Sequence, residues 1–180
     1  MTDFLWEEKY IQPLISSLLN TKALKNVIFI RGISGSGKTT LSNSLSRLLG
    51  SETVAIFSAD NYFIVDGIYK FKIQKMADAH DDCVNSMELA LQSSAIHYII
   101  MDNTHTRRWH LSNAENIANQ YGANLHYIDI IVPDKEHFHL CLNRQIHNVS
   151  EDVLLEQWLN WEENPKSKCV PIFVPSSTQV

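Results

Sequence analysis

A glycine-rich segment near the start of the chain constrains the fold more than any other feature. Residues 32–39 read Gly-Ile-Ser-Gly-Ser-Gly-Lys-Thr and match the pattern G-x-x-x-x-G-K-[ST]. A short β-branched and aromatic run at residues 27–30 precedes them, and helical periodicity follows over residues 38–49. This order of strand, glycine loop and helix predicts a loop that turns its backbone N–H groups around a phosphate.

Each residue type in this loop has a physical task. The glycines let the backbone wrap around a β-phosphate, and the following helix adds partial positive charge at its N-terminus. Lys38 is expected to reach the β- and γ-phosphates and take part in catalysis, while the Thr39 hydroxyl is expected to bind Mg²⁺. The predicted ATP-binding residues are Gly32, Ser34, Gly35, Ser36, Gly37, Lys38, Thr39 and Thr40.

Strands and helices alternate along the rest of the chain. Further strands are expected at residues 54–57, 96–101, 125–132 and 170–174, and helices at 76–91, 109–121, 134–146 and 151–161. Ser150 is an expected N-cap for the last of these helices. The alternation predicts an α/β fold with a central, mostly parallel sheet that is covered on both faces. With the loop at residues 32–39, the expected fold is a three-layer sandwich of the P-loop kinase type with a small helical lid. Ligands of such sheets bind at the carboxyl ends of the strands.

The first 25 residues stand apart from this pattern. Apolar side chains recur at helical spacing between Phe4 and Leu19, and Pro13 predicts a kink or a break there. We expect residues 1–25 to form an N-terminal helix that packs on the core or is appended to it. The alternative is that this helix binds a protein partner. Residues 26–180 are expected to form the P-loop domain, with the lid at about 140–155.

Composition and charge limit the ligands and the cell compartment that the sequence predicts. The formal net charge of −5 does not favour nucleic acid, so such a substrate would need a local basic groove. The three cysteines, Cys83, Cys141 and Cys169, are widely spaced and are expected to be reduced, buried thiols. The N-terminus lacks the flank and apolar stretch of a signal peptide, and the apolar runs are too short to span a bilayer. A cytoplasmic protein without a membrane partner is predicted.

The chain contains no Asn-Lys-x-Asp segment for reading guanine, and it is too short for a two-subdomain mechanical ATPase. Small P-loop kinases are therefore the favoured class. Such kinases place a carboxylate near the acceptor hydroxyl and basic lid residues over the transferring phosphoryl group. Asp60, after the second strand, is the predicted base, and Arg144 is the predicted lid cation. Asp102, which ends the third strand, is predicted to hold Mg²⁺ together with Thr39.

Four segments carry a family resemblance: residues 32–39, 57–63, 101–104 and 143–150. They resemble the P-loop polynucleotide kinase group of AAA-type kinases and, within it, are most similar to the Nedd-four-binding-protein-two-like kinases. The resemblance covers roughly residues 26–163. It implies an ATP- and Mg²⁺-dependent kinase that phosphorylates 5′-hydroxyl ends of nucleic acid. It also implies that Asp60 is the general base and Arg144 the lid arginine.

The chain departs from the family pattern at three places. Asn61 replaces a second carboxylate, His105 replaces the last Asn of the third-strand motif, and a second lid arginine has no counterpart near Asn148. In related enzymes one such arginine contributes about three to five orders of magnitude in rate. Two alternatives therefore stay open: catalysis is slow, or the second positive charge comes from elsewhere than a lid arginine. Among the histidines, His147 in the lid turn is the one of interest.

The predicted substrate-binding residues are Tyr62, Asn103 and Arg107. Arg107 belongs to a compact basic and aromatic cluster in which Trp109 could stack on a base, although Trp109 in the core is an equal alternative. Tyr62 is likewise open to a core role. The favoured acceptor is a 5′-hydroxyl of nucleic acid. The alternatives are a small-molecule kinase acting on a sugar, nucleotide or antibiotic, which the acidic charge favours, and a degenerate ATP-binding adaptor.

Overall fold

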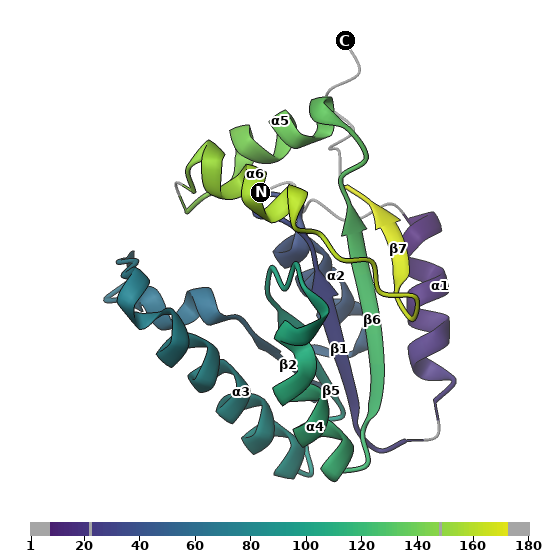
Figure 1. Cartoon of the computed structure of the whole chain (residues 1–180). Helices are drawn as coiled ribbons and strands as arrows, with labels where there is room; N and C mark the ends of the chain where they lie inside the picture. The colour runs from purple at the N-terminus through teal and green to yellow at the C-terminus, as the bar shows by residue number, and fades with distance from the viewer. Residues whose placement is uncertain (1–7, 22, 148, 173–180) are drawn as a thin grey trace.

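Five parallel strands form the central sheet of the computed structural model, which describes residues 8–21, 23–147 and 149–172 (Figure 1). The strand order across the sheet is β2-β5-β1-β6-β7. The strands are β1 (Asn26–Arg31), β2 (Val54–Phe57), β5 (Tyr98–Asp102), β6 (Asn124–Ile131) and β7 (Lys168–Pro171). The predicted α/β fold of the P-loop kinase type is confirmed.

Helices cover both faces of the sheet (Figure 1). The first pair of helices, α1 and α2, lies on one face and the second pair, α3 and α4, on the other, whereas α5 and α6 lie across the carboxyl ends of the strands. Their bounds are α1 (Glu8–Leu19), α2 (Lys38–Leu49), α3 (Met76–Gln92), α4 (Ser112–Gln120), α5 (Lys135–Arg144) and α6 (Glu151–Leu159). The helices α5 and α6 therefore cover the carboxyl edge of the sheet.

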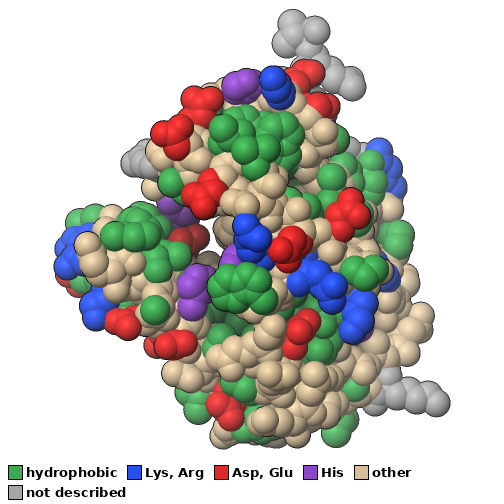
Figure 2. All heavy atoms as spheres, viewed as in Figure 1, with side chains coloured by type: hydrophobic (Ala, Val, Ile, Leu, Met, Phe, Trp, Pro, Cys, Tyr) green, Lys and Arg blue, Asp and Glu red, His purple; other side chains and the backbone are tan. Residues whose placement is uncertain are grey.

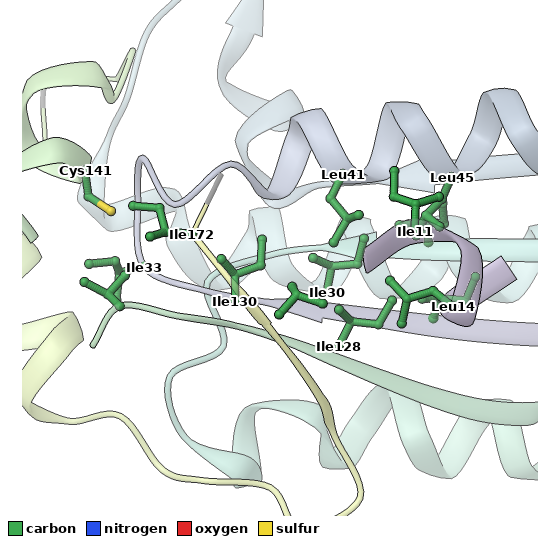
Figure 3. Packing of buried hydrophobic residues seen from close by; sticks show 14 of the residues in the cluster. Ile11, Leu14, Ile30, Ile33, Leu41, Leu45, Ile128, Ile130, Cys141 and Ile172 are labelled. Carbon is green, nitrogen blue, oxygen red and sulfur yellow. The ribbon is translucent and has the colours of Figure 1, made fainter. Parts of the chain in front are cut away.

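The alternation of side chains along β1 divides the core into two layers. Ile28 and Ile30 point into the layer beneath α1 and α2, and Val27 and Phe29 into the layer beneath α3 and α4. This is the period-two pattern expected of a strand that is buried on both faces. Figure 3 shows Ile30 with residues of β6, α1 and α2 in the first layer.

Of the kink or break predicted at Pro13, the break is wrong, because α1 is a single helix from Glu8 to Leu19 with Pro13 inside it. Proline in a helix interior costs about 3 kcal/mol. Four apolar side chains of α1, each worth about 1.5–3 kcal/mol when buried, more than offset that cost. They are Ile11, Leu14, Ile15 and Leu18, which pack in the same layer as α2 (Figure 3). Phe4 lies outside the described residues.

The predicted bounds of helices and strands agree best with the structure for the two segments that follow the glycine loop. The predicted segments 38–49 and 54–57 coincide with α2 and β2. The predicted helix 109–121 is a short 3-10 turn, Arg108–Leu111, followed by α4. The last strand begins earlier than predicted, at Lys168, and residues 173 and 174 lie outside the described part of the chain.

A small hairpin between β2 and α3 was not predicted. Its strands are β3 (Ile64–Val65) and β4 (Ile68–Tyr69), which pair in antiparallel register. The turn residues Asp66 and Gly67 have φ angles of 54° and 75°. Positive φ at both central positions matches the two-residue turn for which Asp-Gly is favoured.

Of the cysteines expected to be buried, Cys83 and Cys141 are, but Cys169 is exposed. Cys169 lies on β7, an edge strand on which Val170 alone is buried, so its side chain faces solvent. None of the helices within the described ranges has the length and apolarity that a membrane crossing requires.

Candidate nucleotide and acceptor site

A cavity of about 500 Å³ opens at the carboxyl ends of β1, β2 and β5, beneath the end of α5. Figure 2 shows the surface hollowed between the lobe that contains α5 and α6 and the lobe at the left. The cavity brings together nine of the predicted site residues: Ser34, Gly35, Gly37, Lys38, Thr39, Thr40, Asp60, Asp102 and Arg144. Four further residues line it: Ser58, Gln145, Ile146 and His147.

The loop at residues 32–39 needs glycine at two positions for reasons of space. A Cβ on Gly35 would lie 2.2 Å from the carbonyl oxygen of Cys141, and φ at Gly35 is +76°. A Cβ on Gly32 would lie 2.5 Å from the Ser36 hydroxyl oxygen. Gly32 and Ser36 therefore form the base of the loop, beneath the residues that line the cavity. The loop thus packs directly against the backbone of α5.

Lys38 and Asp102 form the charged floor of the cavity. Burial lowers the pKa of Lys38, and the carboxylates of Asp102 and Asp60 act in the opposite direction. Burial raises the pKa of Asp102, against which Lys38 and hydrogen bonds from the Thr39 and Ser42 side chains act. Since each desolvated charge is stabilised chiefly by the other, the two groups form a coupled pair.

The oxygen atoms of Thr39 and Asp102 on this floor suit Mg²⁺ as ligands. The Thr39 hydroxyl and the Asp102 carboxylate both line the cavity, and the Thr39 side chain acts to lower the pKa of Asp102. No cluster of three or more His, Cys, Asp or Glu side chains in the described part of the chain could hold a metal by itself. Mg²⁺ is typically bound through one or two carboxylates plus phosphate oxygens, and this arrangement matches that requirement.

Asp60 lines the same cavity, in a 3-10 turn (Ala59–Phe63) that follows β2. Ser58 caps the turn by accepting a hydrogen bond of 3.3 Å from the Asp60 N–H. The Tyr69 hydroxyl donates to Asp60 Oδ1 at 3.1 Å, and His147 Nε2 lies 3.8 Å from Oδ2. The side chain of Asp60 is still 53% exposed, so it is oriented by its neighbours and remains open to a ligand.

The two helices above the loop contact it through polar side chains. Arg144, the last residue of α5, donates from Nε to the Gly35 carbonyl. Gln157 of α6 accepts a hydrogen bond of 2.9 Å from the Ser34 N–H. Burial lowers the pKa of Arg144, against which its contact with Cys141 acts. The predicted N-cap at Ser150 is confirmed, since its side chain accepts from the Val153 N–H.

The three predicted substrate-binding residues do not line the cavity. Asn103 is buried, and its Oδ1 accepts a hydrogen bond of 2.9 Å from the Ala59 N–H, which ties β5 to the turn of Asp60. Tyr62 is 39% exposed and packs edge-on against Phe63. Arg107 binds Asn160 and Glu162 near the end of α6.

The core alternative for Trp109 is wrong, because its side chain is 68% exposed. Trp109 lies edge-on against His110 and lines a separate cavity of about 200 Å³ between residues 106–110 and α6. The basic and aromatic cluster that contains it is therefore on the surface but away from Asp60.

A buried arginine directly before the loop escaped sequence reasoning. Arg31 is fully buried and its Nη1 lies 2.9 Å from Asp129 Oδ2, an ion pair between β1 and β6. It also donates to the carbonyls of His105, Thr106 and Glu162. Burial lowers the pKa of Arg31, and Asp129 opposes the shift. An arginine at the end of an apolar strand was the available signal, since such a charge is buried only with partners.

His105 marks another unusual position. Its φ of 42° lies in the left-handed region, and it is 8% exposed. Burial, with the neighbouring charges of His80 and His110 acting in the same direction, lowers the pKa of His105 to about 3. The imidazole is therefore neutral near pH 7, and its carbonyl accepts from Arg31 Nε.

The parallel sheet, the loop at residues 32–39 and the helices above it define the class of the small P-loop kinases. The chain belongs to the AAA domain family, whose sequence pattern matches residues 27–165. It is 25% identical to human NEDD4-binding protein 2 over 151 residues, which are 84% of this chain and 8% of that protein. The chain thus spans a small part of the length of this relative.

Two solved structures share the fold. A gluconokinase from Sinorhizobium meliloti 1021 superposes with a TM-score of 0.58 at 15% identity and covers 86% of each chain. Kti12 from Chaetomium thermophilum, solved with ADP-AlF3, gives a TM-score of 0.59 at 11% identity over 81% of this chain and 88% of that one. At such identities the likeness concerns the fold.

Proposed function

We propose that this protein is a Mg²⁺- and ATP-dependent kinase that transfers the γ-phosphoryl group to a 5′-hydroxyl of nucleic acid. The observation that carries the proposal is the placement of Asp60 across one cavity from Lys38, Asp102 and Arg144. A phosphoryl-transfer site requires a phosphate cradle, a metal position and a carboxylate for the acceptor, and one lining supplies candidates for each.

The loop and Lys38 would hold the phosphates of ATP. The backbone N–H groups at the N-terminus of α2, which begins at Lys38, offer hydrogen bonds and partial positive charge to an anion. The buried ammonium of Lys38 is stabilised by an added phosphate charge, because burial disfavours it and opposite charge favours it. The relative Kti12, solved with ADP-AlF3, supports nucleotide binding by this fold.

Thr39 and Asp102 would hold Mg²⁺, which when bound neutralises phosphate charge and orients the transferring group. ATP carries about four negative charges, of which Mg²⁺ and Lys38 compensate about three. Arg144, on the same lining, supplies the remaining positive charge. Its guanidinium already touches the loop through Gly35, so it acts at the phosphate end of the cavity.

Asp60 would receive the acceptor. Its carboxylate takes the proton of the attacking hydroxyl while the bond from that oxygen to the γ-phosphorus forms and the β–γ bridging bond breaks, which leaves ADP. Tyr69 holds one carboxylate oxygen, and the other lies 3.8 Å from His147 Nε2, which also lines the cavity. Asn103 fixes the turn that carries Asp60, which gives it a positioning role in place of a substrate contact.

The nucleic-acid acceptor rests on the resemblance of residues 57–63, 101–104 and 143–150 to the polynucleotide kinase group. A small-molecule acceptor is the second candidate, which the net charge of −5 favours. The two differ in salt dependence, since a polymer acceptor gives a KM that rises steeply with salt and a small acceptor gives a shallow one.

The test incubates the protein with γ-labelled ATP, Mg²⁺ and 5′-hydroxyl DNA or RNA oligonucleotides. Asp60→Asn should bind ATP as the wild type does but transfer about 10²–10⁴-fold more slowly, because the proton acceptor is lost. The matched control is Asp82→Asn, which removes the same charge from an exposed position on α3 and should leave transfer unchanged.

The outcomes separate the candidates. Full transfer by Asp60→Asn would show that Asp60 is not the base. A wild-type protein that binds ATP and labels no oligonucleotide would favour a small-molecule acceptor. If sugars, nucleotides and antibiotics also stay unlabelled, the ATP-binding adaptor becomes the better description.

A further inference from the structure

A row of aromatic rings leads away from Asp60 along the hairpin. The His147 ring lies 4.2 Å from the ring of Tyr69, measured between centroids, and the Tyr69 and Phe71 rings lie 6.4 Å apart with planes only 13° from parallel. Phe71 also packs on Phe63, which is buried beneath it at 5.0 Å. The row begins at the carboxylate, because the Tyr69 hydroxyl donates to Asp60.

The outer part of this row is open to solvent. Phe71 is 49% exposed, and Ile68 and Ile73 on the same segment are 59% and 65% exposed. An aromatic ring anchored by a buried Phe63 on one side and exposed on the other presents a rigid surface of the kind that binds flat ligands. The hairpin that carries it is itself fixed by the Asp66-Gly67 turn.

Positive charge alternates with these rings in the sequence. Lys70 and Lys72 flank Phe71, and both are exposed. Neither ammonium has an ion-pair partner among the residues that the structure describes, whereas Lys75 nearby is paired with Asp78 at 2.6 Å. Figure 2 shows lysine or arginine and hydrophobic side chains together on the lobe at the left. In a chain of net charge −5, these lysines give the segment after the hairpin two exposed positive charges.

We infer that Tyr69, Phe71 and His147, with Lys70 and Lys72, form a track for the unpaired nucleotides that follow the 5′-hydroxyl. The inference rests on the proposed function and names its substrate class, a single-stranded end of any sequence. Aromatic faces stack on bases without sequence preference, and lysines contact the phosphates between them. A duplex end, whose bases are already stacked on each other, would use the track poorly.

Two variants test the track without touching Asp60 or the loop. Phe71→Leu keeps apolar bulk over Phe63 but removes the ring, and Lys70→Gln with Lys72→Gln removes the charge. The matched control is Lys166→Gln with Lys168→Gln, an exposed lysine pair of the same spacing beside β7, at the opposite edge of the sheet. Thermal unfolding of each variant shows that it folds as the wild type does.

The readouts are anisotropy of a dye-labelled, single-stranded 5′-hydroxyl oligonucleotide of about ten nucleotides and KM for its phosphorylation. Phe71→Leu should bind about tenfold more weakly. The Lys70 and Lys72 double variant should lower the slope of log K against log salt by about 1.4, since each phosphate contact on a single strand contributes about 0.7. A nucleoside 3′-monophosphate, which has no second nucleotide, should give the same KM with all variants.

Each result decides between the track and its alternatives. If the wild type labels oligonucleotides and both variants keep its KM and salt slope, the track is wrong and the proposed function stands. If the wild type labels no oligonucleotide, the proposed function fails. Anisotropy then tests the track alone, since weaker binding by both variants supports it. Equal binding by the variants overturns it and leaves the exposed apolar hairpin as a surface for protein.

Discussion

The two walls of the cavity are built in different ways. On the loop wall, residues 32–39 lie between the backbone of α5 and the fully buried Arg31, whose partner Asp129 is 1% exposed. On the hairpin wall, Asp60 has a 53% exposed side chain and is held by single contacts from Tyr69 and His147. The loop wall is thus part of the core, whereas the hairpin wall is a surface feature.

This difference has a consequence for binding. A wall that is packed on both sides keeps its geometry whether or not a ligand is present, so its hydrogen-bond donors are fixed in advance. A wall of exposed side chains can adjust to ligands of different shape. The nucleotide phosphates, which are the same in every reaction cycle, are expected at the first wall, and the variable acceptor at the second.

The largest expected effect comes from breaking the buried ion pair of the loop wall. Arg31→Met leaves Asp129 buried without its cation and should lower the free energy of unfolding by about 3–5 kcal/mol. The comparison is Lys75→Met, directly before α3, which breaks the exposed pair with Asp78 and should leave stability unchanged within error. Urea denaturation measures both.

A double variant sharpens that result. Arg31→Met combined with Asp129→Leu removes both charges and should recover most of the stability lost by Arg31→Met alone, because the uncompensated carboxylate is gone. If the single and double variants are equally unstable, packing and the hydrogen bonds to the carbonyls of His105, Thr106 and Glu162 stabilise the wall in place of the charge pair.

A smaller effect is expected from two glycines with the same backbone angle. Gly35 and Gly67 have φ of +76° and +75°, but a Cβ meets the Cys141 carbonyl at 2.2 Å in the first case and nothing within 4 Å in the second. Gly67→Ala should cost about 1 kcal/mol of backbone strain. Gly35→Ala adds overpacking and should cost about 2–4 kcal/mol and weaken ATP binding. Equal costs would show that α5 can move away from the loop.

The last expected effect concerns pH and does not exceed that of Gly35→Ala. Because burial lowers the pKa of His105 to about 3, the folded protein keeps a neutral imidazole at pH 5, whereas the unfolded chain, with a pKa near 6.5, takes up a proton. This stability is present above pH 6.5 and is lost as the pH falls. Between pH 7 and pH 5 the loss amounts to about 2 kcal/mol.

His105→Asn removes the titrating group and also suits the left-handed backbone, in which Asn is tolerated. Urea denaturation at pH 7 and pH 5 should show a smaller loss for this variant than for the wild type. The lowered pKa values of His80, His110 and His126 contribute equally to both proteins. An identical loss in both proteins would mean that His105 is solvated in solution.

Sequence reasoning succeeded where the signal is local. The loop at residues 32–39 is a contiguous pattern, and α2 and β2 have the predicted bounds because periodicity and flanking glycine mark their ends. Asp60 and Asp102 were expected near that loop since parallel strands end at one edge, and Arg144 since it belongs to the predicted lid. All three line the cavity. Their chemical roles remain predictions.

The sequence does not predict the contacts that depend on tertiary structure. The Asn103 amide could serve a ligand or the backbone, and the nearby Ala59 N–H settles where it points. Arg107 contacts Glu162, which lies more than fifty residues later, so no local pattern predicts this partner. Arg31 and Asp129 lie on strands far apart in the sequence, so no local pattern joins them. The Tyr69 contact depends on a hairpin too short to show periodicity.

The hydrogen bond from the Ser34 N–H to Gln157 links the backbone of the phosphate loop to a helix more than a hundred residues later. Any anion that uses this N–H must first displace the Gln157 amide. Anion binding to the loop is therefore coupled to the contact between the loop and α6. The exchange rate and chemical shift of the Ser34 amide proton therefore measure directly whether α6 is hydrogen-bonded to the loop through Gln157.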